Sequence, residues 1–343
     1  MTLRTYIISR ILLTIPMIFI LLTTVFLILR VLPGDPVLLH FEKMENPAAM
    51  AAMRAQLGLD KPLWAQYFDY VVGIFRGDLG KSMQDYSPVA QQIFSAFPAT
   101  LELAICSMII AVLLGVFLGV ESSKAYNKPK DHVIRVFGIV TYAIPVFFLG
   151  MILQLIFGVG LHWLPVGGRI SPTMEPTGLN IGNLHFSTGL FTIDSLLEGN
   201  IYKFVLTLKY LLLPSLTLGL VLCGIFIRLT RSNMLETLRL DFVTAAKARG
   251  LKESTVTYSY ALRNAFLPVL TMMGLQFAML LAGAVLTETT FSWPGLGRYL
   301  VDRINFRDYT AIQGTVVVFG ILVSFVSLAI DLLYAYLDPR IRL

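Results

Sequence analysis

The sequence predicts an all-α polytopic membrane protein with six transmembrane helices. Hydrophobic residues make up 56% of the 343-residue chain and charged residues 14%, and the mean hydropathy is +0.73. A soluble domain carries about 25% charged residues. Six uncharged runs approach or exceed the roughly 18–20 residues that a helix needs to cross hydrocarbon. They are Ile11–Leu29, Leu103–Val120, Val136–Leu161, Tyr210–Ile227, Ala265–Thr287 and Tyr309–Ile330.

The first run follows Arg4 and Arg10, an arrangement that signal peptides also have. Its apolar stretch is longer than a secretory h-region and no small-residue cleavage site follows, so we expect an uncleaved first span. Cys106 and Cys223 fall inside later runs. Isolated thiols in spans serve in packing, and we expect neither a disulfide nor a metal site there.

The segments between the runs are uneven. In the excursion over 31–98, Pro62 begins an amphipathic helix that Gly77 ends, and a shorter helix is predicted over Ala48–Leu57. Two interpretations stay open: these helices meet an external protein or cap an opening, or they only pack over the membrane core. Residues 162–203 are rich in Gly, Pro, Ser, Thr and Asn, which predicts an irregular loop.

The distribution of basic residues predicts the orientation. With the N-terminus inside, the cytoplasmic pieces 1–10, 121–135, 228–264 and 334–343 hold 15 of the 27 Lys and Arg residues. The net charge of +6 is therefore a topology signal and gives no support to nucleic-acid binding. We divide the chain into 1–98, the first span with its external excursion, and 99–343, a five-span core with the cytoplasmic loop at 228–264.

A short polar helix is predicted within that loop, over Asp241–Gly250. Asp241 is placed to cap its start, Lys247 and Arg249 suit the negative end of its dipole, and Gly250 suits a left-handed position after the last turn. Helical spacing puts Phe242, Ala245, Ala246 and Arg249 on one face. That face is suited to docking against another protein, and a helix lying on the membrane surface is the alternative.

No catalytic, cofactor or metal site is expected in this chain. Gly77–Ser82 has two residues between its glycines, whereas a phosphate-binding loop needs four. The four histidines lack metal-ligand spacing, and no serine elbow or pair of carboxylates occurs. Any use of ATP would therefore need another chain.

Motifs run in order along nearly the whole sequence. They are Leu32-Pro-Gly-Asp-Pro36, Leu57-Gly-Leu-Asp-Lys-Pro62, Gly77-Asp-Leu-Gly80, Ala99-Thr-Leu-Glu-Leu103, Ala261-Leu-Arg-Asn-Ala265 with Pro268, Glu288-Thr-Thr-Phe-Ser-Trp-Pro-Gly-Leu-Gly297, Arg307-Asp-Tyr309, Asp331-Leu-Leu-Tyr334 and Asp338-Pro-Arg340. Together they resemble the dipeptide, oligopeptide and nickel permease family of ABC importers, in particular its dipeptide permease B subunits. The helix at 241–250 resembles the cytoplasmic EAA loop of such permeases.

The resemblance implies a type I importer fold in a prokaryotic plasma (inner) membrane, with both termini cytoplasmic. It implies a second homologous permease subunit, two ABC ATPase subunits that hold ATP and Mg, and an extracytoplasmic substrate-binding protein. The ATPase-coupling helix would comprise Asp241, Phe242, Ala245, Ala246, Ala248, Arg249, Gly250 and Leu251. Di- or oligopeptides are the expected substrates, and oligosaccharides, glutathione or nickel chelates are alternatives within the same architecture.

The chain departs from the importer pattern at a few places. Thr244 stands where the general motif has a glutamate, and Asp241 would supply the acid one turn earlier. The spacing from Gly250 to Pro268 is longer than in the general importer pattern and similar to that of the peptide-permease branch. Residues 162–203 are the least recognisable part, which bears on the substrate more than on the architecture.

Polar residues in or beside the spans are candidates for a role in transport. Gln154 and Gln276 are candidates for the translocation path, with hydrogen bonding between helices as the alternative. Glu102 and Asp331 lie near span ends, where interfacial pairing competes with a functional role. An ion-coupled secondary transporter would be expected to have more charged residues within its spans and internal repeats. It would also leave the polar helix over Asp241–Gly250 unexplained.

Overall fold

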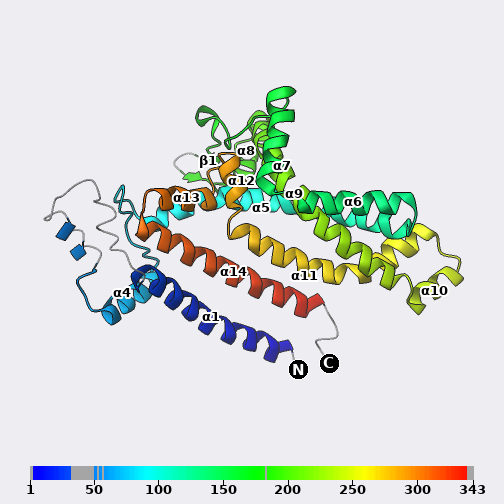
Figure 1. Ribbon diagram of the computed structural model, residues 1–343, viewed down its shortest axis with the longest axis horizontal. Coiled ribbons are helices and arrows are strands. Elements are labelled where there is room, and N and C mark those ends of the chain that lie inside the picture. The colour runs from blue at the N-terminus through cyan, green and yellow to red at the C-terminus, as the bar shows by residue number, and fades with distance from the viewer. Residues whose placement is uncertain (1–2, 32–49, 52–53, 56–57, 182–183, 338–343) are drawn as a thin grey trace.

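The computed structural model describes residues 3–31, 50–51, 54–55, 58–181 and 184–337. Its frame is a set of long helices that run side by side (Figure 1). They are α1 (Leu3–Val31), α5 (Val89–Lys124), α9 (Ile201–Thr237), α11 (Leu262–Leu281) and α14 (Tyr309–Leu337). Five stretches are long and apolar enough to cross a membrane, one on each of these helices. The all-α polytopic prediction is confirmed.

The third predicted span, Val136–Leu161, is present but broken. α6 (Pro129–Ala143) and α7 (Val146–Leu153), which continues as a π-helix to Gly160, pass the length and hydropathy test together and meet at 103°. Ile144 has extended backbone just before Pro145 at the break, because proline cannot continue a helix and restricts the residue before it. The apolar run Val136–Leu161 predicts a span in which Pro145 is a candidate kink, and the structure gives that kink its size.

The predicted bounds of the fifth span, Ala265–Thr287, are wrong. Its helix begins earlier, with a π-helical segment over Thr255–Ala261, and stops at Leu281. Gly283 adopts a φ of 111°, which favours glycine, and lies close to α14. A separate short helix, α12 (Val285–Thr290), follows.

Two shorter helices, α4 (Leu63–Phe75) and α13 (Leu296–Asn305), lie at one end of the bundle, and α8 (Phe191–Leu197) and α12 lie to one side of its middle (Figure 1). The segment predicted as irregular carries α8, a 3-10 turn over Pro172–Met174 and an antiparallel hairpin of β1 (Leu179–Ile181) and β2 (Leu184–Phe186). The helix predicted after Pro62 is confirmed. Most of the predicted helix over Ala48–Leu57 lies outside the described residues, although its described residues are helical.

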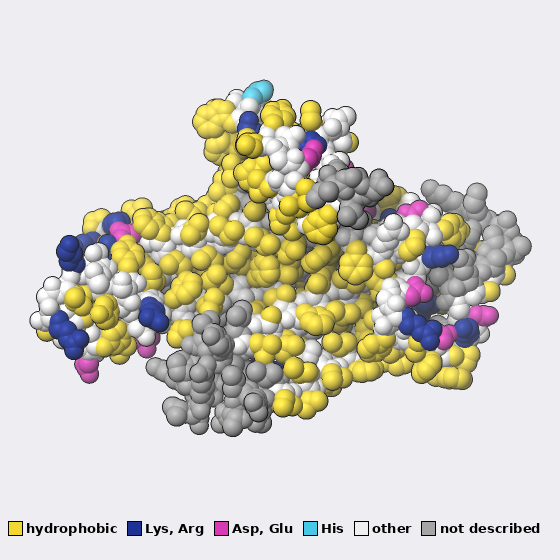
Figure 2. All heavy atoms as spheres, turned by 180° about the vertical axis from the view of Figure 1, so that it is seen from behind, with side chains coloured by type: hydrophobic (Ala, Val, Ile, Leu, Met, Phe, Trp, Pro, Cys, Tyr) yellow, Lys and Arg dark blue, Asp and Glu magenta, His cyan; other side chains and the backbone are white. Residues whose placement is uncertain are grey.

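The opposite end carries α10 (Asp241–Ala248), and both termini point toward it (Figure 1). We call the two ends the α13 end and the α10 end. Figure 2 shows a broad apolar band between charged groups at the two ends, with Lys and Arg at both. A band of this kind suits the hydrocarbon core of a bilayer, with charges left at its two surfaces.

The tightest packing in the bundle is between α5 and α9. Gly115 and Gly119 of α5 lie directly against α9, where a Cβ on either residue would overlap Phe226 or Thr230. Gly219 of α9 lies equally close to Ile110. Small residues let membrane helices approach this closely, and van der Waals contact then supplies much of the attraction. The main apolar core lies along this helix pair and against α11.

Candidate functional site

The α10 helix forms where the sequence predicted it, with one difference at its start. Leu240 is the N-cap residue and no side chain caps the helix, so the predicted capping role of Asp241 is wrong. Asp241 instead lies in the first turn, where its charge suits the positive end of the dipole. The end is as predicted, because Gly250 has a φ of 73° and its N–H donates to the Lys247 carbonyl at 2.9 Å.

The orientation of α10 corrects its predicted docking face. Val243 is fully buried and Ala246 is 4% exposed, so both face the chain's own interior. The prediction that Ala246 is one of the outward-facing contact residues is therefore wrong. The exposed members of the predicted coupling helix are Asp241, Phe242, Ala245, Ala248, Arg249, Gly250 and Leu251.

Val243 and Ala246 belong to a small apolar core, which we call the loop core. Its buried members are Val120, Met234, Val243, Ala246, Val256, Ala261 and Ala265. They come from α5, α9, α10, the π-helical segment and α11, so four other segments hold α10 in place. A load applied to α10 therefore reaches the ends of three long helices directly.

A buried ion pair lies beside the loop core. The Asp131 carboxylate is fully buried and accepts two hydrogen bonds from Arg231, from Nε and Nη2, each at 2.8 Å. Ser122 Oγ and the Asn127 backbone N–H donate to the same carboxylate at 2.5 and 3.0 Å. Bidentate pairing of this kind fixes geometry as well as charge. It ties the turn between α5 and α6 to α9.

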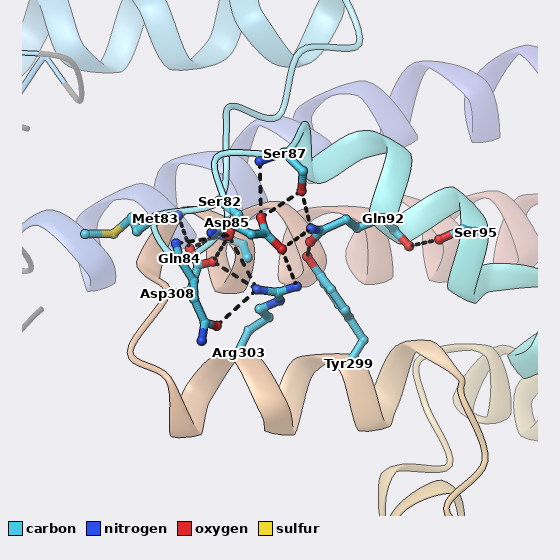
Figure 3. Close-up of polar contacts among 11 residues, drawn as sticks. Ser82, Met83, Gln84, Asp85, Ser87, Gln92, Ser95, Tyr299, Arg303 and Asp308 are labelled. Atoms are coloured by element: carbon cyan, nitrogen blue, oxygen red, sulfur yellow. Dashed lines mark hydrogen bonds and ion pairs between the residues drawn. The ribbon is translucent and has the colours of Figure 1, made fainter. Parts of the chain in front are cut away.

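A second network holds the α13 end (Figure 3). The buried Asp308 carboxylate accepts from Ser82 Oγ at 2.5 Å and from the backbone N–H of Met83 at 3.1 Å. It also accepts from the Ala311 N–H at 3.1 Å, which satisfies a free donor in the first turn of α14. Asp308 thereby fixes the segment after α4 against the start of α14.

Arg303 of α13 extends this network. Its guanidinium lies 3.6 Å from Asp308 and 3.3 Å from Asp85, and packs over the Tyr299 ring at 4.9 Å from the centroid. Burial raises the pKa of Tyr299 to about 12, and its hydroxyl donates to Gln92 Oε1. Burial acts to raise the pKa of Asp85 as well, but hydrogen bonds, first among them those from Ser87, outweigh it and leave the pKa below its usual range.

Glu102 forms a buried ion pair with the loop after α7. Arg169 donates to Glu102 Oε2 from Nη2 at 2.7 Å and from Nε at 3.1 Å, and its guanidinium stacks 3.7 Å from the Phe191 ring centroid. The Thr192 N–H donates to Oε1 at 2.7 Å. Asp331 pairs with Arg10 at 3.3 Å. Both acids are thus paired within the chain, as the interfacial interpretation expects.

Glu288 is a buried carboxyl without a cation among its hydrogen-bond partners in the described residues. It is fully buried and accepts from Thr100 Oγ1 at 2.8 Å and from the Arg298 N–H at 2.9 Å. Burial raises its pKa, and these hydrogen bonds only partly offset that effect. Gly295 and Gly297 are required beside it, because a Cβ on either would overlap its carboxyl group.

The two glutamines predicted for a translocation path lie in different settings. Gln154 Nε2 donates to the carbonyl oxygens of Val166 at 2.6 Å and Thr290 at 3.2 Å, which ties the π-helix after α7 to two other segments. Gln276 is partly buried within α11, with its Nε2 3.7 Å from Met272 Sδ. Their role in a path stays a prediction, and Gln154 has a clear structural one.

The segment Gly77–Ser82 has a structural use as well. Gly77 and Gly80 have φ values of 78° and 82°, and a Cβ on Gly80 would lie 2.7 Å from Thr310 Cγ2. Ser82 donates to Asp308. Within the described residues, no group of three or more His, Cys, Asp or Glu side chains could hold a metal ion.

Sequence reasoning missed the buried ion pair of Asp131 and the hydrogen bonds of Asp308 because their partners are far apart in the chain. Asp131 and Arg231 are 100 residues apart, and Ser82 and Asp308 are 226 residues apart. No spacing rule connects such positions. A charged residue at a span end was the one available signal, and it singled out Glu102 but not Asp131.

Known proteins match this chain over almost its full length. Residues 111–343 match the family model for the binding-protein-dependent transport system inner membrane component, and residues 3–104 match the corresponding N-terminal model. The dipeptide transport system permease protein DppB of Alkalihalophilus pseudofirmus is 39% identical over 337 residues, 98% of this chain and 99% of that protein. The di/tripeptide permease DppB of Pseudomonas aeruginosa is 40% identical, with 98% of each chain covered.

A third relative is named for a different substrate. The glutathione transport system permease protein GsiC of Salmonella choleraesuis is 37% identical over 337 residues, 98% of each chain. All three relatives are named as permease proteins of transport systems. With the bundle of apolar helices and the exposed α10 helix already described, these matches show that the chain belongs to the family of binding-protein-dependent transport system inner membrane components.

Proposed function

We propose that this chain is the permease subunit of an ATP-driven ABC importer and forms, with a homologous subunit, the translocation path for di- or oligopeptides. The observation that carries the proposal is α10, an exposed polar helix fixed by the loop core to the ends of α5, α9 and α11. Two of the relatives are named as dipeptide or di/tripeptide permeases, which supports peptides as the substrate class. Glutathione, itself a tripeptide, is the second candidate because of the GsiC match.

The α10 end faces the cytoplasm in this proposal. The 15 of 27 Lys and Arg residues that fall in the pieces assigned to that side support it, because cytoplasmic loops carry an excess of basic residues. Two ATPase subunits, which hold ATP and Mg, would bind α10, and both termini would be cytoplasmic. A substrate-binding protein would dock at the α13 end. The division into 1–98 and 99–343, with the coupling loop at 228–264, remains part of the proposal.

The mechanism follows from the fixed position of α10. Closure of the ATPase subunits would push on the exposed residues Phe242, Ala245 and Arg249. Because Val243 and Ala246 are embedded in the loop core, that push would move the attached helix ends together. Rigid-body movement of these helices would then alternate access to the path.

The test places one bulky side chain at two exposed positions of α10. Ala245→Trp enlarges the proposed ATPase-facing surface, whereas Lys247→Trp adds the same bulk on another side of the helix, so it serves as the matched control. Both variants would be purified as complexes and reconstituted with the binding protein. We expect Ala245→Trp to lower dipeptide-stimulated ATP hydrolysis at least about tenfold, a barrier change of about 1.4 kcal/mol, and Lys247→Trp to leave it nearly unchanged.

Equal activity of Ala245→Trp and the wild type in an assembled complex would refute the docking surface. Ala246→Trp is unsuitable here, because bulk at that buried position disturbs the loop core itself. Stimulation by glutathione, an oligosaccharide or a nickel chelate, in place of dipeptides, would keep the importer and replace its substrate.

A further inference from the structure

A polar cavity at the α13 end has no part in the proposed transport cycle. It has a volume of about 460 Å³ and lies between α1, α4, the segment after α4 and α14. The side chains that define its chemistry are Arg30 of α1, Gln66 and Tyr70 of α4, and Gln313 of α14. Figure 1 shows α4 beside the end of α1 at this end of the molecule.

Three polar atoms in this cavity are buried and, among the described residues, have no hydrogen-bond partner of good geometry, although the Tyr70 hydroxyl lies close enough to Gln313 to interact with it. They are Gln66 Oε1, the Tyr70 hydroxyl and Gln313 Nε2. Gln313 is 9% exposed, so its amide has little access to bulk water. The Tyr70 hydroxyl is protonated at neutral pH and can donate, and burial raises its pKa further, to about 12. Because buried polar groups are normally paired, the cavity is built for a polar occupant.

The charge of the cavity favours an anion. Arg30 is half-buried and makes no ion pair or hydrogen bond with the residues that the structure describes. The two lining acids are already engaged, since Asp69 pairs with Lys61 at 2.7 Å and Asp78 Oδ1 accepts from the Gly80 N–H at 2.9 Å. A guanidinium beside a hydroxyl and an amide donor suits the oxygens of a phosphate or carboxylate.

The location of the cavity favours a lipid. Arg30 is the last residue of the candidate span Ile8–Arg30, and Gln313 lies near the start of the span Tyr309–Leu332. The cavity therefore lies near one surface of the bilayer. Trp64, Phe68 and Phe75 are exposed on the other face of α4, and aromatic side chains are typical of a membrane interface.

We propose that this cavity binds the phosphate headgroup of an acidic phospholipid. Arg30 and the donors of Tyr70 and Gln313 would hold the phosphate oxygens, and Gln66 Oε1 would accept from a headgroup hydroxyl. Leu27 and Ile28, exposed on α1 just before Arg30, offer an apolar surface for the acyl chains. Free phosphate offers the same oxygens without those apolar contacts, so the lipid is the favoured source. In the proposed orientation it would belong to the outer leaflet.

The test is native mass spectrometry of the full-length chain, purified in detergent with its associated subunits and stripped of lipid. Phosphatidylglycerol and phosphatidylcholine with the same acyl chains would be titrated separately, and inorganic phosphate would be the third probe. We expect phosphatidylglycerol to bind more tightly than phosphatidylcholine. Arg30→Gln should weaken phosphatidylglycerol binding about tenfold, because it removes the charge-assisted hydrogen bonds.

Two further variants separate the site from general effects of charge and folding. Tyr70→Phe removes only a hydroxyl and should also weaken binding, in a chain whose packing is unchanged. Arg76→Gln is the matched control for Arg30→Gln. Arg76 lies at the end of α4, is exposed and does not line the cavity. Equal binding of the two lipids, or equal loss in Arg30→Gln and Arg76→Gln, would overturn the proposal. Binding of inorganic phosphate without phosphatidylglycerol would overturn the lipid as its source.

Discussion

The ion pair of Asp131 and Arg231 should be the strongest single electrostatic contribution at the α10 end. Asp131 is fully buried and accepts four hydrogen bonds, two of them from Arg231. Removing one partner of a buried, hydrogen-bonded ion pair costs about 3–5 kcal/mol, because the other charge stays buried. We therefore expect Asp131→Ala to lower the free energy of unfolding by about 4 kcal/mol.

The Arg231→Ala variant should cost about 3 kcal/mol, at the lower end of that range. It leaves the fully buried Asp131 carboxylate without its cation, but Ser122 and Asn127 still donate to that carboxylate. In the double variant no charge is left buried, so its loss should be smaller than the sum of the two single losses by at least about 1 kcal/mol.

The measurement is equilibrium unfolding of the purified chain by SDS in mixed micelles, followed by circular dichroism, for the two single variants and the double variant. Lys130→Ala is the control in the same turn, because it removes an exposed ion pair with Glu121 that should contribute at most about 1 kcal/mol. Additive losses in the double variant would refute the claim that Asp131 and Arg231 act as a buried pair. Losses no larger than that of Lys130→Ala would refute the magnitude.

Two further predictions concern the α13 end. Asp308→Ala should expose the segment after α4, because it removes the acceptor for Ser82 and the Met83 N–H. We expect the hydrogen exchange of the Met83 amide to become at least about tenfold faster. Unchanged exchange would contradict this role of Asp308. Glu288 has a raised pKa because of burial, so its folded state holds the proton more tightly and stability should fall as the pH rises above the ordinary carboxyl value of 4.5. Glu288→Gln should remove this part of the pH dependence in thermal unfolding, and an unaltered pH profile would contradict the assignment.

The sequence predicts helices well where one local cause dominates. Long uncharged runs predict the membrane helices, and Gly250 predicts the end of α10, because hydrocarbon length and a positive φ are local requirements. The direction in which α10 faces is a different matter. Phe242 and Ala246 share a predicted face, yet Ala246 turns inward, because the apolar ends of α9 and α11 lie on that side. A spacing rule cannot distinguish an inward alanine from an outward one.

The break at Pro145 shows the same limit from another side. A proline within an apolar run predicts a kink but not its size, and here the helix turns through 103°. Tertiary packing decides the angle, because α7 lies against α9 and α12. A Cβ on Gly150 would lie 3.0 Å from the Phe291 ring. The pattern of Phe291 and Gly150 in the sequence carries no sign of that contact.

The long helix α5 connects the two groups of buried acids. The first half of α5 carries Thr100 and Glu102, which bind Glu288 and Arg169. Its last turns carry Val120 and Ser122, which belong to the loop core and to the Asp131 pair. Its 36 residues extend about 54 Å at 1.5 Å per residue.

Close packing of α5 on α9 at its glycines makes the two helices one body, because packed interfaces resist continuous deformation. A displacement of α10 should therefore reach the α13 end as a movement of this whole body. Weakening the α5–α9 contact, for example with Gly115→Leu, should separate ATP hydrolysis from uptake while leaving α10 itself intact. If that variant assembled and transported normally, the helix pair would not be the connection between the two ends.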